Sequence, residues 1–400
     1  MKKLLQINPT VRESTSTGKI MREIGEMAIS AGWESYIAYS GARDGIPPHS
    51  SKLVPVGSRL DLLIHFLATR LLDAHGLASR RATRKLIERI RDIDPDIIHI
   101  HNIHGYFLNY PELFAYLAAS GKPVIWTVHD CWLYTGHCYH YASAGCDRWQ
   151  TECHDCPCKT RFPASYGLDR SHRNYRLKKQ CFTSLPNFTL VVVSDWMKSE
   201  LAKSFLADVP CLTIHNGIDT QVFAPKETPA AAGVYYLAVA SIWLKEKGLE
   251  DLAELAGLLS PDERLVVVGK MSESQKRSLP EKVETIERTA DVRTLVSLYS
   301  GATTLVNPTW QDNYPTVNLE SISCGTPVVT YRTGGSVESI TPETGYIVEQ
   351  GDVKGMYGCL QQIRQQNREA WRRSCRDHAL RHFDKSAALD AYLKLYESLS

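Results

Sequence analysis

Short runs of apolar residues alternate with longer amphipathic stretches along the whole chain. The first series of apolar runs is KLLQI, SYIAY, DIIHIH, PVIWTV and FTLVVVS. A second series begins near Tyr235 with YYLAVAS, RLVVVG, VETIER, TTLVNP and PVVTYR. Runs this apolar are typical of parallel strands that are covered on both faces of a sheet. The amphipathic stretches between them predict helices, for example over 18–30, 82–93 and 111–120.

Two such series of strands and helices predict two doubly wound α/β domains. The boundary is expected in TIHNGIDTQVFAPKETPAAAG, where Asn216-Gly217 is turn chemistry and the stretch after Phe223 is typical of a linker. We therefore expect an N-terminal Rossmann-like domain over 1–218 and a C-terminal one over 219–400. The packing of the last helix, about 386–399, is left open.

The composition indicates an ordinary globular protein. The 400 residues are 43% hydrophobic and 22% charged, and the formal net charge is +2. Without a dominant basic field we expect no nucleic-acid partner. No apolar run reaches the roughly 18 residues of a membrane-spanning helix. The start, MKKLLQINPT, is typical of a first strand and not of a signal peptide, which predicts a cytoplasmic protein.

The segment Leu60–Ile93 is apolar in its first half and rich in arginine in its second. Such a sequence has two interpretations. It can form one or two solvated surface helices, or it can form a helix that lies on an anionic membrane surface. The second interpretation adds a peripheral site at the cytoplasmic membrane face to the expected location.

Several glycines and lysines follow predicted strands, where a phosphate group can bind. Gly18-Lys19 is not a P-loop, because Ile20 stands where a Ser or Thr would bind magnesium, and the G-x-G-x-x-G pattern is absent. Gly18 at a helix start can still present its backbone N–H to an anion. Gly334-Gly335 after PVVTYR, and Lys245 and Lys247 after YYLAVAS, offer the same chemistry in the second domain.

The stretch DNYPTVNLESISCGTP places two carboxylates around a helix start. Pro315 fits a first helical position and Gly325 fits the stop. Asp312 then lies in the loop before the helix, and Glu320 lies inside it. Carboxylates accept hydrogen bonds from hydroxyl groups, and the amino end of the helix supplies N–H donors. This arrangement suits a ligand with hydroxyls at both ends and phosphate between, as in a nucleotide sugar.

Six cysteines fall between 131 and 158, within a segment of about 131–160 that looks like an insertion. Cys153 and Cys156 form a C-x-x-C pair, and Cys138 and Cys146 can complete a four-thiolate zinc site. The zinc would be structural, because four thiolates leave no open position. Reduced thiols without metal, and a disulfide or redox pair, are the alternatives. Further candidate ligands are His137, His140, His154 and Cys158.

The sequence resembles the family-4 retaining glycosyltransferases of GT-B fold over essentially the whole chain. DNYPTVNLESISCGTPVVTYRTGG is similar to their motif of two acids separated by seven residues, IHNGID to their interdomain segment and KGLE to their lysine loop. WTVHDCWLYTGHC resembles the branch that builds colanic-acid-like and capsular exopolysaccharides. The resemblance implies two domains that face across a cleft. It also implies a nucleotide diphosphate sugar as donor, with UDP before GDP, and a growing saccharide acceptor that is lipid-linked.

The resemblance also assigns roles to residues. His129, at the acceptor side, and Asp312, which would hold the hexose, are the catalytic candidates. Glu320 would hold the ribose, Lys247 the diphosphate, and Gly18 the diphosphate from the first domain. The remaining expected donor contacts are Lys245, Asn313, Tyr314, Thr316, Gly334 and Gly335.

The chain departs from the family in two places. The first acid, usually Glu, is Asp312, and Ser241 and Ile242 stand where an arginine commonly precedes the lysine. No catalytic metal is expected. A catalytically idle, sugar-binding or scaffold protein of the same fold is the alternative function.

Overall fold

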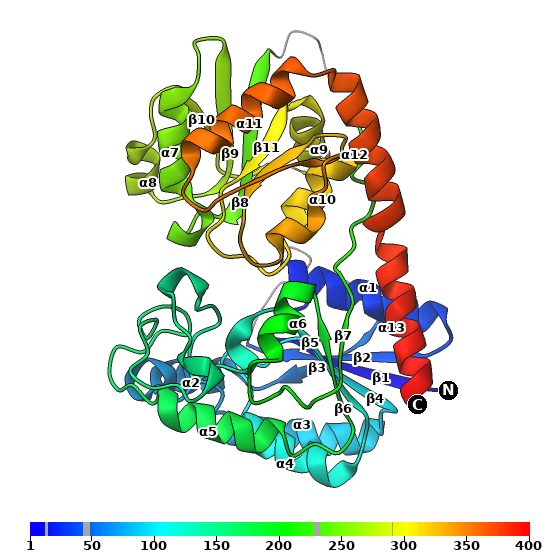
Figure 1. Ribbon diagram of the computed structural model, residues 1–400. Coiled ribbons are helices and arrows are strands. Elements are labelled where there is room, and N and C mark those ends of the chain that lie inside the picture. The colour runs from blue at the N-terminus through cyan, green and yellow to red at the C-terminus, as the bar shows by residue number, and fades with distance from the viewer. Residues whose placement is uncertain (13–14, 43–48, 228–232, 290) are drawn as a thin grey trace. The chain divides into compact units, whose positions relative to one another are not determined.

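The computed structural model describes residues 1–12, 15–42, 49–227, 233–289 and 291–400 (Figure 1). The chain forms two compact units. Unit 1 comprises Met1–Ile214 and Leu389–Ser400, and unit 2 comprises His215–Ala388. The division thus falls between 214 and 215 instead of between 218 and 219, and the end of the chain belongs with unit 1. Residues 228–232, part of the predicted linker, lie outside the described residues.

Unit 1 is a doubly wound α/β unit, as predicted. Its described residues form a parallel sheet of seven strands in the order β3-β2-β1-β4-β5-β6-β7, with helices on both faces (Figure 1). The strands are β1 (Lys3–Ile7), β2 (Glu34–Ser40), β3 (Lys52–Val56), β4 (Ile97–Ile100), β5 (Val124–Val128), β6 (Phe188–Val192) and β7 (Cys211–Thr213). The helices are α1 (Ser16–Ser30), α2 (Arg59–Leu72), α3 (Arg80–Ile93), α4 (Tyr110–Ser120), α5 (Ser171–Phe182) and α6 (Asp195–Leu201).

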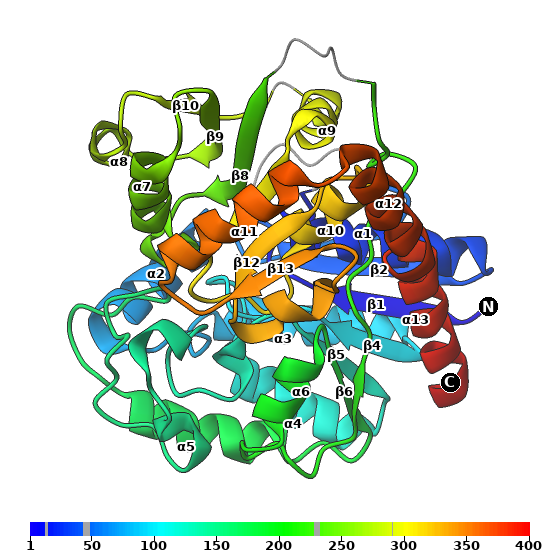
Figure 2. The ribbon, with the colours of Figure 1, turned by 45° about the horizontal axis from the view of Figure 1, so that its top comes forward.

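Unit 2 repeats this architecture with six described strands. Its parallel sheet has the order β10-β9-β8-β11-β12-β13. The strands are β8 (Val234–Ile242), β9 (Glu263–Lys270), β10 (Val283–Ile286), β11 (Thr304–Asn307), β12 (Val328–Tyr331) and β13 (Gly345–Val348). The helices are α7 (Leu249–Leu258), α8 (Glu273–Ser278), α9 (Val292–Gly301), α10 (Thr316–Ser323), α11 (Val353–Gln365) and α12 (Arg368–His382). Figure 2 shows α11 lying along one face of this sheet, against α7, β12 and β13.

Central strands form where the sequence is continuously apolar, and the ten predicted strands are confirmed. Every residue of β4, β5, β11 and β12 is buried. Three strands were not predicted, β3, β7 and β13, and all three lie at sheet edges. Edge strands are covered less completely, and β3 (KLVPV) and β7 (CLT) are only partly buried. They therefore lack the apolar run that marks a strand buried on both faces.

The carboxyl-terminal part of the last helix, α13 (Lys385–Leu399), packs on unit 1. Tyr392 and Tyr396 are buried there, and their hydroxyl groups meet partners in the sheet. The Tyr396 hydroxyl lies 2.6 Å from His99 Nδ1, and the Tyr392 hydroxyl lies 2.9 Å from Thr127 Oγ1. His99 Nε2 is 2.8 Å from the same Thr127 oxygen. Buried polar groups need such partners, so these hydrogen bonds hold the carboxyl-terminal part of the helix on the sheet.

The segment 129–170 between β5 and α5 is long and irregular. Its described regular elements are three short 3-10 helices, at Cys131–Leu133, Ala142–Ala144 and Arg148–Gln150. Lys178 of α5 reaches under it, and its buried ammonium group donates to the carbonyls of Trp132 at 2.6 Å and Thr135 at 2.9 Å. Burial lowers the pKa of Lys178 to about 7. Polar contacts thus replace secondary structure in ordering this segment.

The arginine-rich segment Leu60–Ile93 forms two helices with opposite behaviour. α3 buries its apolar face, including Leu86, Ile87 and Ile90, and so is a surface helix of the ordinary kind. α2 instead leaves large apolar side chains in solvent. Among the described residues, no helix is both long and apolar enough to cross a membrane.

Candidate functional site

Three loops of unit 2 leave the sheet at neighbouring carboxyl ends, after β8, β11 and β12. The strand order places these strands side by side and reverses between β8 and β11. In doubly wound sheets, ligands bind where the strand order reverses, at the carboxyl ends of the strands. Five residues predicted to contact a donor lie in these loops: Lys245, Lys247, Asp312, Gly334 and Gly335.

The loop after β11 is fixed by its two neighbours. The Trp310 N–H donates to the Glu246 carbonyl at 2.8 Å, and the Thr333 hydroxyl donates to the Trp310 carbonyl at 3.0 Å. The Gly335 N–H donates to the Asp312 carbonyl at 3.2 Å. The backbone around Asp312 is therefore held by the loops on either side of it.

Lys247 and Asp312 form an ion pair across the reversal point. Lys247 Nζ lies 2.6 Å from Asp312 Oδ2, and their side chains are 32% and 19% exposed. The Tyr314 N–H donates to Asp312 Oδ1 at 3.3 Å. From the family resemblance, Lys247 is expected to bind a diphosphate and Asp312 a sugar. The structure brings the two groups together, so a ligand that reaches one also reaches the other.

Gly334 is required by the close approach of its loop to Asp312. Its φ is +48°, and an added Cβ would lie 2.0 Å from the Asp312 carbonyl oxygen. Residues other than glycine rarely adopt this backbone conformation, and no side chain has room at this position. Gly334 and Gly335 begin a 3-10 helix, Gly334–Ser339. The glycine pair therefore fixes the position of Asp312, in addition to any contact with a phosphate.

Glu320 lies on α10 and is oriented by a tyrosine of α9. The Tyr299 hydroxyl donates to Glu320 Oε2 at 2.9 Å. Tyr299 is fully buried, and burial raises its pKa well above the ordinary value, so it remains a donor. α10 begins one residue later than predicted, because Pro315 is its N-cap in an extended conformation and not its first helical residue. Its end agrees with the prediction, since Gly325 follows the C-cap Cys324 with a φ of +80°.

The other predicted donor residues of unit 2 lie at different depths. Lys245 is exposed at the start of a 3-10 helix, Lys245–Lys247. Asn313 and Tyr314 are buried, and the Tyr314 ring lies 4.9 Å from the His215 ring. Thr316 is the first residue of α10. Asn313 and Tyr314 thus have structural contacts of their own, while Lys245 lies in solvent.

Gly18 of unit 1 is buried in the first turn of α1. From the sequence, its N–H is expected to face an anion. In the structure this N–H donates to the side chain of the N-cap Thr15 at 3.2 Å. A Cβ at Gly18 would lie 2.3 Å from the Arg12 carbonyl oxygen, which explains the glycine by close packing. A phosphate would have to displace Thr15 to reach this group.

His129 directly follows β5 and joins a chain of polar groups. Its Nε2 lies 3.1 Å from His101 Nδ1, which follows the neighbouring strand β4. His101 Nε2 lies 3.0 Å from Gln6 Oε1 on β1. Burial lowers the pKa of His129 to about 4 and that of His101 well below its ordinary value. Both imidazoles are therefore neutral near pH 7.

The hydrogen bonds determine which nitrogen of each ring carries the proton. The Gln6 amide nitrogen donates to the Met21 carbonyl at 3.0 Å, so Gln6 Oε1 is the atom that accepts from His101 Nε2. Since neutral His101 has one N–H, its Nδ1 accepts, and His129 Nε2 is the donor. His129 Nδ1 therefore carries a lone pair. His129 can accept a hydrogen bond at this atom, but it holds no proton there to donate.

Sequence reasoning missed His101, Gln6 and Tyr299. A signal for His101 was present, because HIH ends a buried strand and its last histidine falls at the carboxyl end, where ligands bind. Tyr299 carried no comparable signal. It lies 21 residues before Glu320, and only the packing of α9 against α10 brings the two together.

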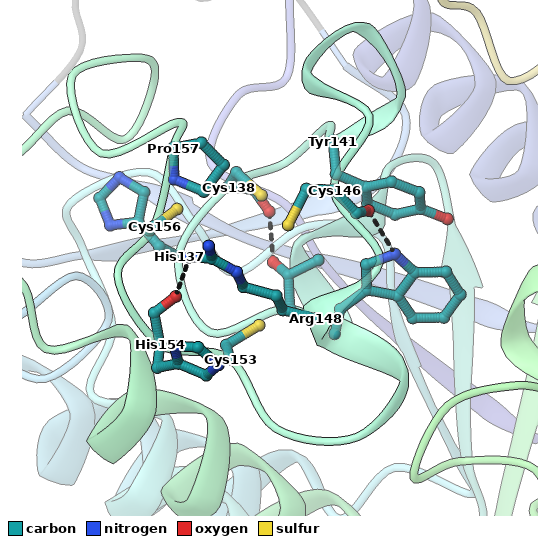
Figure 3. Close-up of a pocket in the computed structure, with 11 residues that line it drawn as sticks. His137, Cys138, Tyr141, Cys146, Arg148, Cys153, His154, Cys156 and Pro157 are labelled. Atoms are coloured by element: carbon teal, nitrogen blue, oxygen red, sulfur yellow. Dashed lines mark hydrogen bonds between the residues drawn. The ribbon is translucent and has the colours of Figure 1, made fainter.

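The four predicted zinc ligands lie around one small cavity of unit 1 (Figure 3). Cys138, Cys146, Cys153 and Cys156 all line it, whereas Cys131 and Cys158 do not. All cysteines of this segment belong to the described residues, and each is a free thiol. His137 and His154 also line the cavity, but His137 Nδ1 is bonded to Asp73 at 2.6 Å.

Comparisons with known proteins agree with this architecture. Residues 18–222 match the family described as Glycosyltransferase Family 4, and residues 233–366 match Glycosyl transferases group 1. The chain is 24% identical over 367 residues to a protein of Escherichia coli K12 described as a colanic acid biosynthesis glycosyl transferase, WcaC. That match covers 88% of each chain.

Solved structures show the same fold. The sucrose-phosphate synthase of Thermosynechococcus elongatus has a TM-score of 0.72 at 16% identity, and the match covers 100% of this chain and 99% of that one. HepE of Anabaena, solved in complex with UDP and glucose, has a TM-score of 0.68 at 14% identity, with 100% of both chains covered. The predicted GT-B-like fold of two Rossmann-like domains is thereby confirmed.

We predict that Gly334→Ala destabilises unit 2 and displaces the loop that carries Asp312. The left-handed conformation alone costs an alanine about 1–2 kcal/mol, and the clash with the Asp312 carbonyl adds to this. The control is Gly358→Ala, because Gly358 lies inside α11 with nothing near its Cβ position. The free energy of unfolding of that variant should rise by about 0.5–1 kcal/mol. Urea unfolding of both variants measures the difference, and equal stability of Gly334→Ala and wild type would contradict the prediction.

Proposed function

Because the chain belongs to glycosyltransferase family 4, we propose that it transfers a sugar from a nucleotide diphosphate sugar to a saccharide acceptor with retention of configuration. That the protein is a glycosyltransferase follows from the family; the donor, the acceptor and the stereochemistry are our proposal. The observation that carries the proposal is the Lys247–Asp312 pair at the reversal of strand order, with Glu320 on the helix that follows. UDP is the favoured nucleotide, since HepE was solved with UDP, and GDP is the next.

In the proposed complex, Lys247 binds the diphosphate while it keeps its contact with Asp312. An ammonium group has three donors, so it can serve a carboxylate and a phosphate together. Asp312 then accepts hydrogen bonds from hydroxyls of the transferred sugar. The backbone of Asn313, Tyr314 and Thr316 supplies further N–H groups near the amino end of α10, where the helix dipole favours negative charge. The glycine pair Gly334-Gly335 allows the phosphates to approach the backbone.

The bond from the anomeric carbon to the β-phosphate oxygen breaks in this reaction, and a bond to the acceptor oxygen forms on the same face. The proton of the acceptor hydroxyl passes to the departing phosphate oxygen. Negative charge grows on that phosphate, and Lys247 and the amino end of α10 stabilise it. These groups carry the charge in our proposal, so no metal ion has a role in it. Neutral His129 orients a sugar hydroxyl by accepting its hydrogen bond at Nδ1.

We further propose a lipid-linked acceptor at an anionic membrane surface, as in exopolysaccharide assembly. The support is an apolar stripe on α2 at helical spacing, which we call the α2 patch: Leu60, Leu63, Ile64, Leu67 and Leu71. These side chains belong to residues that are 46–65% exposed. Apolar patches of this kind on a folded surface commonly mark interaction sites.

The surroundings of the α2 patch favour a lipid surface as its partner. Phe162, Tyr166 and Leu168 are also exposed, and their loop is tied to the end of α2 by hydrogen bonds from Tyr166 N–H to the Arg70 carbonyl and from Leu168 N–H to the Leu71 carbonyl. Exposed Arg59 begins the helix, and the Arg70 guanidinium lies over the rings of Phe66 and Tyr166. Apolar side chains beside basic ones match the acyl chains and headgroups of an anionic bilayer.

Glu320→Ala should weaken nucleoside diphosphate binding, because it removes a carboxylate that accepts from the ribose. Loss of hydrogen bonds to a charged group corresponds to about 1.5–3 kcal/mol in binding free energy. Calorimetry with UDP and with GDP measures this, and exposed Glu281→Ala is the control. If neither nucleotide binds wild type, or Glu320→Ala binds as well as wild type, the ribose assignment is wrong. A panel of nucleotide sugars completes the test. Binding without turnover across the panel and its acceptors would favour the catalytically idle alternative.

His129→Ala should lower kcat by about 10- to 100-fold while donor binding stays near the wild-type value, because the hydrogen bond removed is made to the reacting sugar. His172→Ala is the matched control, since His172 is a half-exposed histidine of the same unit. Turnover with the preferred donor from the panel is the measurement. If His129→Ala has the wild-type kcat, the proposed role is wrong and His129 has a purely structural role.

The double variant Leu63→Asp with Leu67→Asp should abolish binding to anionic vesicles, since two charges would enter the apolar stripe. Flotation at low salt with vesicles of phosphatidylglycerol and phosphatidylethanolamine is the measurement. Leu380→Asp is the control, because Leu380 is a similarly exposed leucine of α12. Wild-type protein that stays with the bottom fraction at low salt would contradict the membrane proposal and leave the donor assignment unaffected.

A further inference from the structure

The small cavity within the irregular segment 129–170 has the size and the lining of an ion site. Its volume is about 10 Å³, close to that of a single water molecule or ion. Four of its eleven lining residues are cysteines, and Figure 3 shows their thiol groups directed into the cavity from several turns of the segment. A cavity of this volume excludes organic ligands, whereas convergent thiol groups are the ligands that zinc prefers in structural sites.

The structure selects four of the six cysteines in this segment. Cys138, Cys146, Cys153 and Cys156 line the cavity. Cys131 and Cys158 are buried and do not line it, although the Cys158 thiol lies beside that of Cys138. The sequence spacing favoured the same four cysteines and kept Cys158 as a further candidate. The selected cysteines come from widely spaced points of the segment, so one ion bound by all four would join those points.

Backbone contacts already position the C-x-x-C pair. The Gly136 N–H donates to Cys153 Sγ at 3.2 Å, and the Cys156 N–H donates to Asp169 Oδ2 at 2.7 Å. A Cβ at Gly136 would lie 2.8 Å from the Cys153 Cβ and 2.2 Å from the Ser171 carbonyl oxygen. Only glycine allows this approach. Hydrogen bonds from N–H groups to sulfur stabilise thiolates, and outer contacts of this kind orient metal ligands.

The surrounding charges are complementary to a metal thiolate centre. Zn²⁺ with four thiolates has a formal charge of −2, and two cations lie beside the cavity. Arg148 lines it, and its guanidinium donates to the carbonyl of His154 (Figure 3). It also donates to the carbonyl of Asp155. Lys178, fully buried beneath the segment, donates to two neutral carbonyls and lies close enough to interact electrostatically with the thiols of Cys153 and Cys138. Anionic thiolates would stabilise the charged form of this buried lysine.

We propose that Cys138, Cys146, Cys153 and Cys156 bind one structural zinc ion as four thiolates. Each thiol loses its proton when the ion binds, and four sulfurs complete a tetrahedral site with no open position. A zinc–sulfur distance of about 2.3 Å requires sulfurs about 3.8 Å apart. Among the described residues, no three of these sulfurs lie within 4.8 Å of one another, so binding draws them inward and moves Arg148 aside. The irregular backbone of the segment permits this movement.

The zinc would order the segment that directly follows His129. A segment of this length with three short 3-10 helices has little regular structure to hold it. A bound ion contributes its binding free energy to folding, because the site exists only in the folded chain. The proposal is independent of the proposed transfer reaction, since the ion is structural and touches no reacting group.

Elemental analysis of the full chain, purified without a metal-affinity tag, should find about one zinc per chain. The ion should be released when a mercurial titrates the thiols. Replacement by Co²⁺ should give the thiolate-to-metal charge-transfer bands and visible spectrum of a tetrahedral thiolate site. Chelation should accelerate tryptic cleavage within 129–170, where Arg148, Lys159 and Arg161 lie. These measurements use wild-type protein, so they remain decisive even if a variant fails to fold.

Variants test the ligand set. Single changes Cys138→Ser, Cys146→Ser, Cys153→Ser and Cys156→Ser should each lose the zinc, while Cys158→Ser and Cys211→Ser should retain it. Circular dichroism and urea unfolding report whether each variant is otherwise folded. Wild-type protein that contains no zinc, gives no cobalt spectrum and keeps a protease-resistant segment would overturn the proposal. So would a disulfide among the four cysteines of the native protein, or loss of zinc from Cys158→Ser with retention in Cys146→Ser.

Discussion

The ion pair between Lys247 and Asp312 joins the two loops that leave the sheet of unit 2 where its strand order reverses. Parallel strands bring their carboxyl ends to one edge, and the reversal sends the loops after β8 and β11 in opposite directions. A single 2.6 Å contact between opposite charges bridges this divergence. Two neighbouring contacts hold the same loop. Gly334 has no Cβ that would clash with the Asp312 carbonyl, and the Trp310 N–H binds the Glu246 carbonyl. The donor chemistry we propose depends on this bridge, because it places a cation and a carboxylate side by side.

In unit 1, burial and hydrogen bonds together fix the protonation of the histidines. His129, His101 and Gln6 follow or occupy adjacent strands, and their hydrogen bonds run from ring to ring to amide. His101 is buried and His129 is partly buried, and this burial disfavours the charged forms of both histidines, so their pKa values fall. Neutrality, together with the fixed Gln6 amide, leaves the lone pair of His129 on Nδ1. A fully hydrated histidine would have no such preference, so the hydrogen-bonded chain determines what His129 can do chemically.

The segment 129–170 becomes ordered with little regular secondary structure. It lacks the backbone ladders of helices and sheets, and the loss of conformational entropy on ordering it must be offset by side-chain contacts. Aromatic packing among Tyr134, Tyr141 and Trp149 contributes, and so do the buried hydrogen bonds of Lys178. A metal centre would add four fixed points and would also balance the buried positive charge. The segment begins at His129, the residue that follows β5, so its order bears on the position of the histidine for which we propose a role in transfer.

The sequence by itself determined the features that depend on local pattern: ten strands, the carboxyl-end loops that carry Lys247, Asp312 and Gly334, and the resemblance that the family match confirmed. These are encoded in periodicity, in glycine and proline, and in fixed spacing. Tertiary structure decided the rest. It paired Lys247 with Asp312, Tyr299 with Glu320 and His101 with His129, gave the Gly18 N–H to Thr15, placed Tyr396 against His99, and left the α2 patch in solvent. Most of these pairs are far apart in the chain, and their contacts arise only when sheet order and helix packing bring them together. No local pattern records that information.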